Sequence, residues 1–262
     1  MPGLFHLLRK TVLGQNRMGR YLAYGLGEIV LLVIGILLAL QINNWKEHYN
    51  DRVQEIAYLK KLKLDLEQNK KQVVEVDKYH DYMILGARRL LDAITDDTGT
   101  VSSDTLAVAM ELAGWTRNSY FVRKAWDELM AIGNTNLIEN AELLEELTQY
   151  YHRQTAMYYA EEKECNVFHE GIRRLTGEVL PPDIRFKIMG FLHPLGAPVP
   201  EQVELASPNF VHALREIDGV QGYLVDLIEC RKTSDYILSL LQGKIDSLQQ
   251  AVDRELALLD QS

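Results

Sequence analysis

Motifs that identify an enzyme are missing from this sequence. It contains no nucleophile elbow, no zinc-binding helix motif and no calcium loop. The glycines of Gly25-Leu26-Gly27 run directly into an apolar segment with no strand before them, so they do not form a phosphate-binding loop. We therefore expect no catalytic residues, no metal and no cofactor, and a protein that is not an enzyme.

Cysteine, proline and strand patterns are also scarce. The only cysteines are Cys165 and Cys230, which permit one disulfide in an oxidising compartment. Six of the seven prolines lie between Thr176 and Phe210. No run alternates apolar and polar residues in the way a strand does, so we predict an all-α fold.

Basic residues are outnumbered by acidic residues, 28 against 37, for a net charge of −9. The first 20 residues carry four bases and no acid, so residues 21–262 have 24 bases, 37 acids and a charge of −13. A body this acidic makes nucleic acid a poor partner. The arm 1–20 has apolar residues between its bases, and we expect it to lie as an amphipathic helix on an anionic membrane surface.

What the sequence has in abundance is one run of Ile, Leu and Val. From Ile29 to Trp45 a helix rises roughly 25 Å, close to the hydrocarbon core of about 30 Å. The tyrosines at 21, 24 and 49 and Trp45 frame the run as interfacial aromatics do. We predict a transmembrane helix within 21–45. No small-residue cleavage site follows it, which indicates an uncleaved signal anchor.

The orientation of this helix is predicted from the basic arm. Lysine and arginine also follow the span, but they alternate with acids on a long domain, and such domains often translocate regardless of charge. We expect the anchor in the inner membrane, with a cytoplasmic N-terminus and residues 46–262 in the periplasm.

The rest of the chain shows helical spacing of apolar residues. Steps of three and four residues connect the following positions into one seam: Leu59, Leu62, Leu66, Val73, Val76, Met83, Ala87, Leu90 and Ile94. The first helix should thus continue out of the membrane to about Ile94. Ser102 or Ser103 and Asn140 are candidate N-caps of later helices.

Three further arms follow the first helix. We expect them over residues 102–132, from Asn140 to before Pro181, and after Asp218-Gly219, with an irregular proline-rich loop at 176–209. The arm over 102–132 should be interrupted near Arg117-Asn118-Ser119, where Ser119 could cap a new helix. The arm from Asn140 has its own apolar seam at Leu143, Leu147, Tyr150, Met157, Cys165, Phe168, Ile172 and Leu175. Together the arms predict an elongated antiparallel four-helix bundle on its anchor, with the loop at the end far from the membrane.

Two patches resemble a known family. The first is Gly27-Glu28-Ile29-Val30, Val33-Ile34-Gly35-Ile36 and Ala39-Leu40-Gln41-Ile42-Asn43-Asn44-Trp45, and a looser one runs from Ala125-Trp126-Asp127-Glu128-Leu129 to Tyr150-Tyr151. They are similar to uncharacterised single-span proteins of Bacteroidetes that share a domain of unknown function. The resemblance implies an envelope location and no established activity.

Two polar positions within apolar patterns are candidate functional residues. Glu28 is a carboxylate in the membrane helix, where it either pairs in an oligomer or on a proton path, or lies in water at the cytoplasmic edge. His80 interrupts the seam, as Asn69 does, and either sets register, partner number or pH response, or lies in a partly wet seam. Small residues at 23, 27, 35 and 39 share one face that admits close helix approach.

Three other sets of residues were weighed. Glu161, Cys165 and His169 share a helical face, but no fourth metal ligand is visible, so we expect no metal there. Phe186, Met189 and Phe191 belong to an apolar part of the proline-rich loop that either closes the bundle or docks a partner. Cys165 and Cys230 lie level on neighbouring arms, about 16 Å from the same end, which leaves a disulfide open.

The function that these features favour is binding of a protein partner, or of further copies of the chain, at the cell envelope. The alternative is a sensory module that binds a ligand between its helices and signals through a partner. An enzyme is the third and least favoured reading.

Overall fold

The computed structural model describes residues 17–96, 101–115, 120–133, 137–192, 204–205, 207 and 209–260. The chain divides into two compact units, an N-terminal unit of Met1–Ala57 and a body of Tyr58–Ser262. Within the described residues all regular structure is helical, as the sequence predicts. Most of the predicted arm 1–20 lies outside the described residues.

In the N-terminal unit, helix α2 (Arg17–Thr95) begins and carries the predicted span. Every large apolar side chain described between Leu26 and Ile42 is exposed. Among the described helices, α2 is the one long and apolar enough to cross a membrane.

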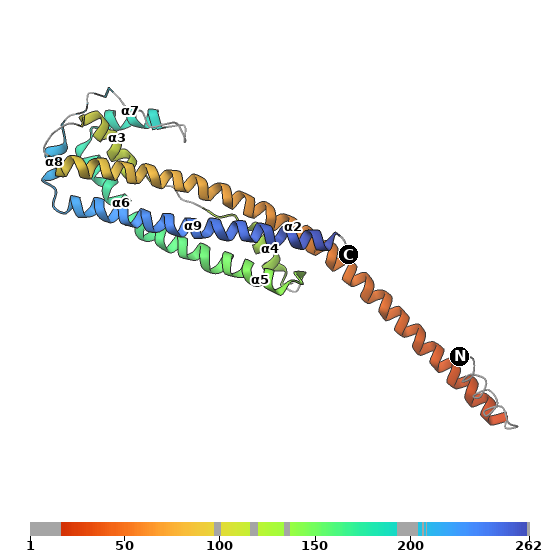
Figure 1. Cartoon of the computed structure of the whole chain (residues 1–262). Coiled ribbons are helices and arrows are strands. Elements are labelled where there is room, and N and C mark those ends of the chain that lie inside the picture. Colours follow the sequence, from red (N-terminus) through yellow and green to blue (C-terminus); the bar gives the residue numbers. More distant parts are fainter. Residues whose placement is uncertain are drawn as a thin grey trace. The chain divides into compact units, whose positions relative to one another are not determined.

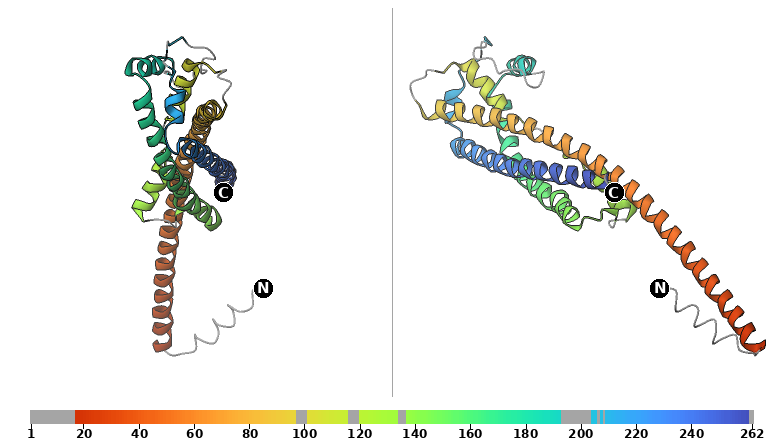
Figure 2. Two further views of the ribbon diagram at one scale, coloured as in Figure 1. Left: turned by 90° about the vertical axis from the view of Figure 1, so that its left-hand side faces the viewer. Right: turned by 45° about the vertical axis from the view of Figure 1, so that its right-hand side comes forward.

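The body contains three long helices side by side: α2 from Tyr58 onward, α6 (Thr155–Val179) and α9 (Val220–Leu259), as Figures 1 and 2 show. Ion pairs Lys63–Asp253 at 2.7 Å and Lys70–Asp246 at 2.6 Å show that α9 runs antiparallel to α2. All nine apolar positions of the seam predicted for α2 are buried.

The predicted third arm is continuous but is not a regular α-helix. Its N-cap is Asn140, as expected, and α5 (Ala141–Thr148) passes through the π-helix η2 (Gln149–Gln154) into α6. A π turn inserts an extra residue, so the buried face moves by one position. For this reason Met157, expected on the seam, is 47% exposed, while Tyr158 is fully buried.

The predicted second arm is interrupted, as expected, but its second helix has Arg123 and not Ser119 at the N-cap. It consists of α3 (Ser103–Ala113), capped by Ser102, and α4 (Lys124–Ile132), with a non-helical stretch at 120–123. This stretch is non-helical because side chains of other helices take up its backbone groups, including the amide of Phe121, which donates to the Tyr159 hydroxyl at 2.8 Å. The four-helix bundle is therefore not confirmed.

The proline-rich segment 176–209 was expected to be irregular, and this is wrong for its first half. Helix α6 continues to Val179, and α7 (Pro182–Leu192) follows at once. Pro182 is at the first helical position, where the missing N–H costs nothing. The residues after Leu192 up to 203, including Leu195, lie outside the described residues.

The end of the body at Thr95 is closed by α3, α7 and the short helix α8 (Val211–Arg215), which lie together in Figure 1. Arg215 of α8 donates to the carbonyls of Ala93, Ile94 and Asp96, which caps the C-terminus of α2. Gly86 lets α3 approach the α2 backbone closely, because a Cβ there would overlap the carbonyl oxygen of Ala109.

Candidate functional site

A buried arginine in α9 is the centre of the candidate site. The Arg231 side chain is 1% exposed, and its guanidinium contacts two histidines and a carboxylate from two other helices. We name this set the Arg231 network. Its members are His80 of α2, Glu162 and His169 of α6, and Arg231 and Asp235 of α9.

His80 lies between two carboxylates. Its Nδ1 is 2.6 Å from Asp235 Oδ1, and its Nε2 is 3.4 Å from Glu162 Oε1. Burial opposes protonation of the imidazole, but the hydrogen bonds with Asp235 and Glu162 outweigh it and raise the His80 pKa. His80 is thus a buried histidine held in a setting that favours its charged form.

His169 has the opposite environment, although it belongs to the same network. Its Nδ1 is 3.1 Å from the carbonyl oxygen of Ala113, and its Nε2 accepts a hydrogen bond of 2.6 Å from Arg231 Nε. The Nδ1 nitrogen must then carry the proton. Burial, together with the nearby guanidinium, lowers the His169 pKa to about 3.

Glu162 completes the charge balance. Arg231 Nη1 donates to its Oε1. Burial acts to raise the Glu162 pKa, but the hydrogen bond with His80 and the charge of Arg231 outweigh burial and lower it. With His80 protonated, the network holds two cations and two anions. A buried set with matched charges is tolerated, whereas one unpaired member is costly.

A disulfide lies next to the Arg231 network. Cys165 of α6 and Cys230 of α9 are bonded, with 5.7 Å between their Cα atoms. The sequence left this pairing open, and the antiparallel packing of α6 and α9 brings the two residues level. The two helices are covalently joined one residue away from Arg231.

The metal-ligand set weighed from the sequence is not assembled. The Cys165 sulfur is engaged in the disulfide, and the His169 nitrogens face Ala113 and Arg231. Glu161 Oε1 does lie 3.6 Å from Cys230 Sγ. Glu161, Cys165 and Cys230 are therefore close together, but bonded sulfurs are not thiolate ligands.

Asn69, the other polar residue of the seam, serves the backbone of the second arm. Its amide donates to the Val122 carbonyl at 2.8 Å and accepts from the Val122 N–H at 2.6 Å. One turn earlier, Asp65 Oδ2 accepts the Ala125 N–H at 2.7 Å, at the start of α4. Asn69 thus has a structural role, because its side chain satisfies both backbone groups of Val122 in a non-helical stretch.

The apolar residues of the proline-rich segment that was predicted to be a loop lie on two faces of α7. Ile184, Ile188 and Leu192 are buried at four-residue spacing. Phe186 is 81% exposed and Met189 50% exposed. The Phe191 side chain lies outside the part that the structure describes. The buried face closes the body, while Phe186 and Met189 remain on its surface.

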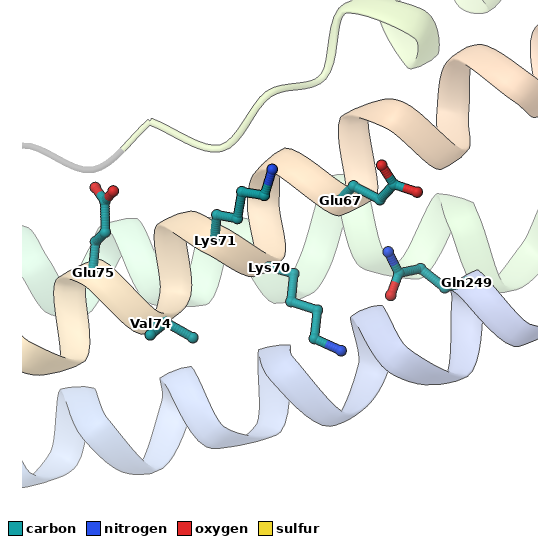
Figure 3. A pocket seen from close by; sticks show the side chains of 6 residues that line it. All are labelled: Glu67, Lys70, Lys71, Val74, Glu75 and Gln249. Atoms are coloured by element: carbon teal, nitrogen blue, oxygen red, sulfur yellow. The ribbon is translucent and has the colours of Figure 1, made fainter.

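Two further features lie on the surface. Glu28 lies on the exposed surface of α2 among apolar residues of the predicted span. A surface groove between α2 and α9 is lined by Glu67, Lys70, Lys71, Val74, Glu75 and Gln249 (Figure 3). Its lining mixes both signs of charge and selects no chemical class of ligand.

Sequence reasoning singled out His80 and weighed His169, but it missed Glu162, Arg231 and Asp235. A signal for Arg231 was present. The apolar spacing of α9, followed backward from Leu238, passes through Ser234 and Arg231 to Leu227, and all of these residues are buried. A charged residue on such a seam marks a buried ionic contact.

Comparison with known proteins connects part of the chain with a family. No curated protein and no solved structure matches the chain significantly. Residues 28–96 match the model of a family described as a family of unknown function, DUF6090. The match begins at Glu28, covers the rest of the first patch that carried the resemblance, and ends one residue after α2. The second patch lies outside it, so this chain is similar to DUF6090 proteins over its first helix.

Proposed function

We propose that the chain is a membrane-anchored protein of the cell envelope that binds a protein partner through the exposed face of α7. The anchor is the apolar part of α2 in the inner membrane, with the N-terminus in the cytoplasm and the body in the periplasm. The proposal involves no catalysis.

The observation that carries the proposal is the exposure of Phe186 and Met189 on a helix that is otherwise fixed. Ile184 and Ile188 are buried, and Arg185 pairs with Glu111 of α3 at 2.7 Å. The exposed face of α7 is therefore a preformed surface rather than a segment that could fold inward. Exposed aromatic and Met side chains on a rigid surface are the usual anchors of protein interfaces.

The charge beside this surface indicates the kind of partner. Lys187 is exposed between the two apolar residues along the chain, whereas the neighbouring Arg185 is paired within the body. We expect a partner with an apolar pocket for Phe186 and a carboxylate at its rim.

Three observations support the location. The large apolar side chains described in the span are exposed, as they are when lipid covers them. The disulfide of Cys165 and Cys230 requires an oxidising compartment in most organisms. The basic residues before the span favour a cytoplasmic N-terminus. We further propose that the second arm acts as the fourth member of an antiparallel bundle, since Asn69 holds Val122 against α2.

The test is photo-crosslinking in intact cells from a photoreactive amino acid at Phe186. The matched control places the same group at Tyr236 of α9, which is 65% exposed and far from α7 in sequence. We expect a discrete crosslinked product at position 186 alone, weakened at least several-fold by Met189→Asp or Lys187→Glu. A product of twice the chain mass would identify self-assembly instead of a separate partner. No product at position 186, or equal products at both positions, would refute the proposal.

A second candidate, the sensory module, is favoured by one observation. The Arg231 network places titratable groups where three helices meet, and such a junction can respond to a chemical change in the surroundings. The stimulus that fits these groups is the proton.

A further inference from the structure

We propose that the Arg231 network is a pH-sensitive switch that holds α2 against the pair of α6 and α9. The switch is closed while His80 carries a proton and His169 does not. This inference is independent of the partner surface on α7.

The connections among the three helices are unequal at this level. Helices α6 and α9 are joined covalently through Cys165 and Cys230. Helix α2 is joined to them by His80, which contacts Asp235 on α9 and Glu162 on α6. Loss of the His80 contacts would therefore weaken the packing of α2, while α6 and α9 stay together.

A protonated His80 satisfies both carboxylates that face it. Its Nδ1–H donates to Asp235, and its Nε2 lies 3.4 Å from Glu162 Oε1 and 3.1 Å from Arg231 Nη1. In protonated His80 the Nε2–H faces Glu162, whose Oε1 also accepts from Arg231. In neutral His80, Nε2 accepts from Arg231 instead, the hydrogen bond to Glu162 is lost, and the two carboxylates face one cation. The groups around His80 from each packed helix are Asp77 and Asp81 on α2, Glu162 and His169 on α6, and Arg231 and Asp235 on α9.

His169 must stay neutral for the same contacts to hold. Its Nε2 lone pair accepts the Arg231 Nε–H, and its Nδ1–H donates to the Ala113 carbonyl of α3. A second proton would remove the acceptor and set an imidazolium against a guanidinium inside the body. Acid therefore opens the network at His169, and base opens it at His80.

The sign of each effect follows from the pKa directions. The His80 pKa is raised, so its contribution to stability is complete below the unfolded value of about 6.5 and is lost as the pH rises through the folded pKa. The His169 pKa is lowered to about 3, so its contribution is present above about 6.5 and is lost as the pH falls. Each effect changes the unfolding constant by about tenfold per pH unit within its window. Stability should peak near neutral pH.

The experiment measures urea unfolding of the full chain in detergent micelles between pH 4.5 and 9, by circular dichroism. The variants are His80→Gln and His169→Gln, with His212→Gln as the control because His212 is exposed on α8. We expect His80→Gln to lose the decline on the alkaline side and His169→Gln to lose the decline on the acid side. The control should keep both. Asp77 and Glu161, whose pKa values are raised by burial, also titrate in acid and add to the pH dependence of every variant. The pH dependence of each variant is therefore compared with that of the wild type.

Two further measurements keep the proposal open to refutation if a histidine variant fails to fold. Asp235→Asn, at a partly exposed position, should move the alkaline decline to lower pH, because His80 loses a carboxylate. Hydrogen exchange, corrected for its intrinsic pH dependence, should show residues 76–90 of α2 losing protection at alkaline pH before residues 225–235 of α9. The switch would be overturned if the alkaline loss of stability persisted in His80→Gln or occurred at an unchanged pH in Asp235→Asn. Earlier loss of protection in α9 than in α2 would overturn it as well.

Discussion

Helix α2 exposes its large apolar residues in the N-terminal unit and buries one face of them in the body. In the first region Leu37 is 55% exposed, and its exposed neighbours are apolar as well. In the second, Leu62 and Leu66 are fully buried, while Leu64 between them is 59% exposed. Equal exposure in the two regions therefore has different meanings. Leu37 fits a lipid surrounding and Leu64 fits water, because the residues near Leu64 include Lys60, Lys61 and Lys63.

The strongest test of this difference places charges at exposed positions of α2 in both regions. Ile34→Arg with Leu37→Arg should raise the cost of membrane insertion by about 5–7 kcal/mol, since an Arg at the centre of a span costs about 2.5–3.5 kcal/mol. Alkaline carbonate should then release the chain from membranes. The matched control, Leu64→Arg with Val74→Arg, also changes two exposed residues of α2 and should leave the chain in the membrane fraction. Equal release of both variants would show that the N-terminal part of α2 is not in lipid.

The next prediction concerns the body and the oxidising compartment proposed for it. The disulfide closes a sequence separation of 65 residues, so Cys165→Ala with Cys230→Ala should lower the free energy of unfolding by about 2–4 kcal/mol. Chemical unfolding followed by circular dichroism measures the loss, and reduction of the wild type should reproduce most of it.

The same cysteines report on location. Alkylation of freshly isolated membranes, followed by intact-mass analysis with and without reductant, should find no free thiol before reduction. Two alkylated cysteines in the untreated sample would contradict the oxidising compartment and would also remove the link between α6 and α9.

The smallest expected effects compare two glycines in helices of the body. Gly86→Ala should destabilise the body by about 1–3 kcal/mol, because the new Cβ would overlap the Ala109 carbonyl and lie 2.8 Å from the Ala113 nitrogen. Gly243→Ala, in the middle of α9 with nothing within 4 Å, should stabilise the body by about 0.5–1 kcal/mol. Urea unfolding of both variants gives the two signs. A gain in stability for Gly86→Ala would mean that α3 does not cross α2 closely.

The seam of α2 was predictable because it depends on period alone. A face repeated every three or four residues must be buried somewhere, and every apolar residue assigned to this seam is buried. The N-caps at Ser102 and Asn140 were predictable for a similar reason, since each uses a side chain and a backbone amide three residues apart. The Met157 prediction failed because the π turn before α6 shifts the face, and spacing alone gives no sign of such a turn.

The candidate site was harder to predict because its members come from three helices. The site joins His80, Glu162 and Arg231, which are separated by 82 and 69 residues in the sequence. A periodic pattern predicts which face of a helix is buried, but it does not predict which other helix packs against that face. The pairing requires the register of α2 against α9, which Lys63–Asp253 and Lys70–Asp246 display only in the folded chain.

By itself the sequence determined the helical fold, the apolar span and which face of α2 is buried in the body, because these follow from composition and from period within one element. The tertiary structure decided that the His80 pKa is raised and the His169 pKa lowered, that Cys165 meets Cys230, and that Phe186 stays outside while Ile188 is buried. Each of these depends on which atoms of another helix lie within a few ångströms, and packing alone sets that.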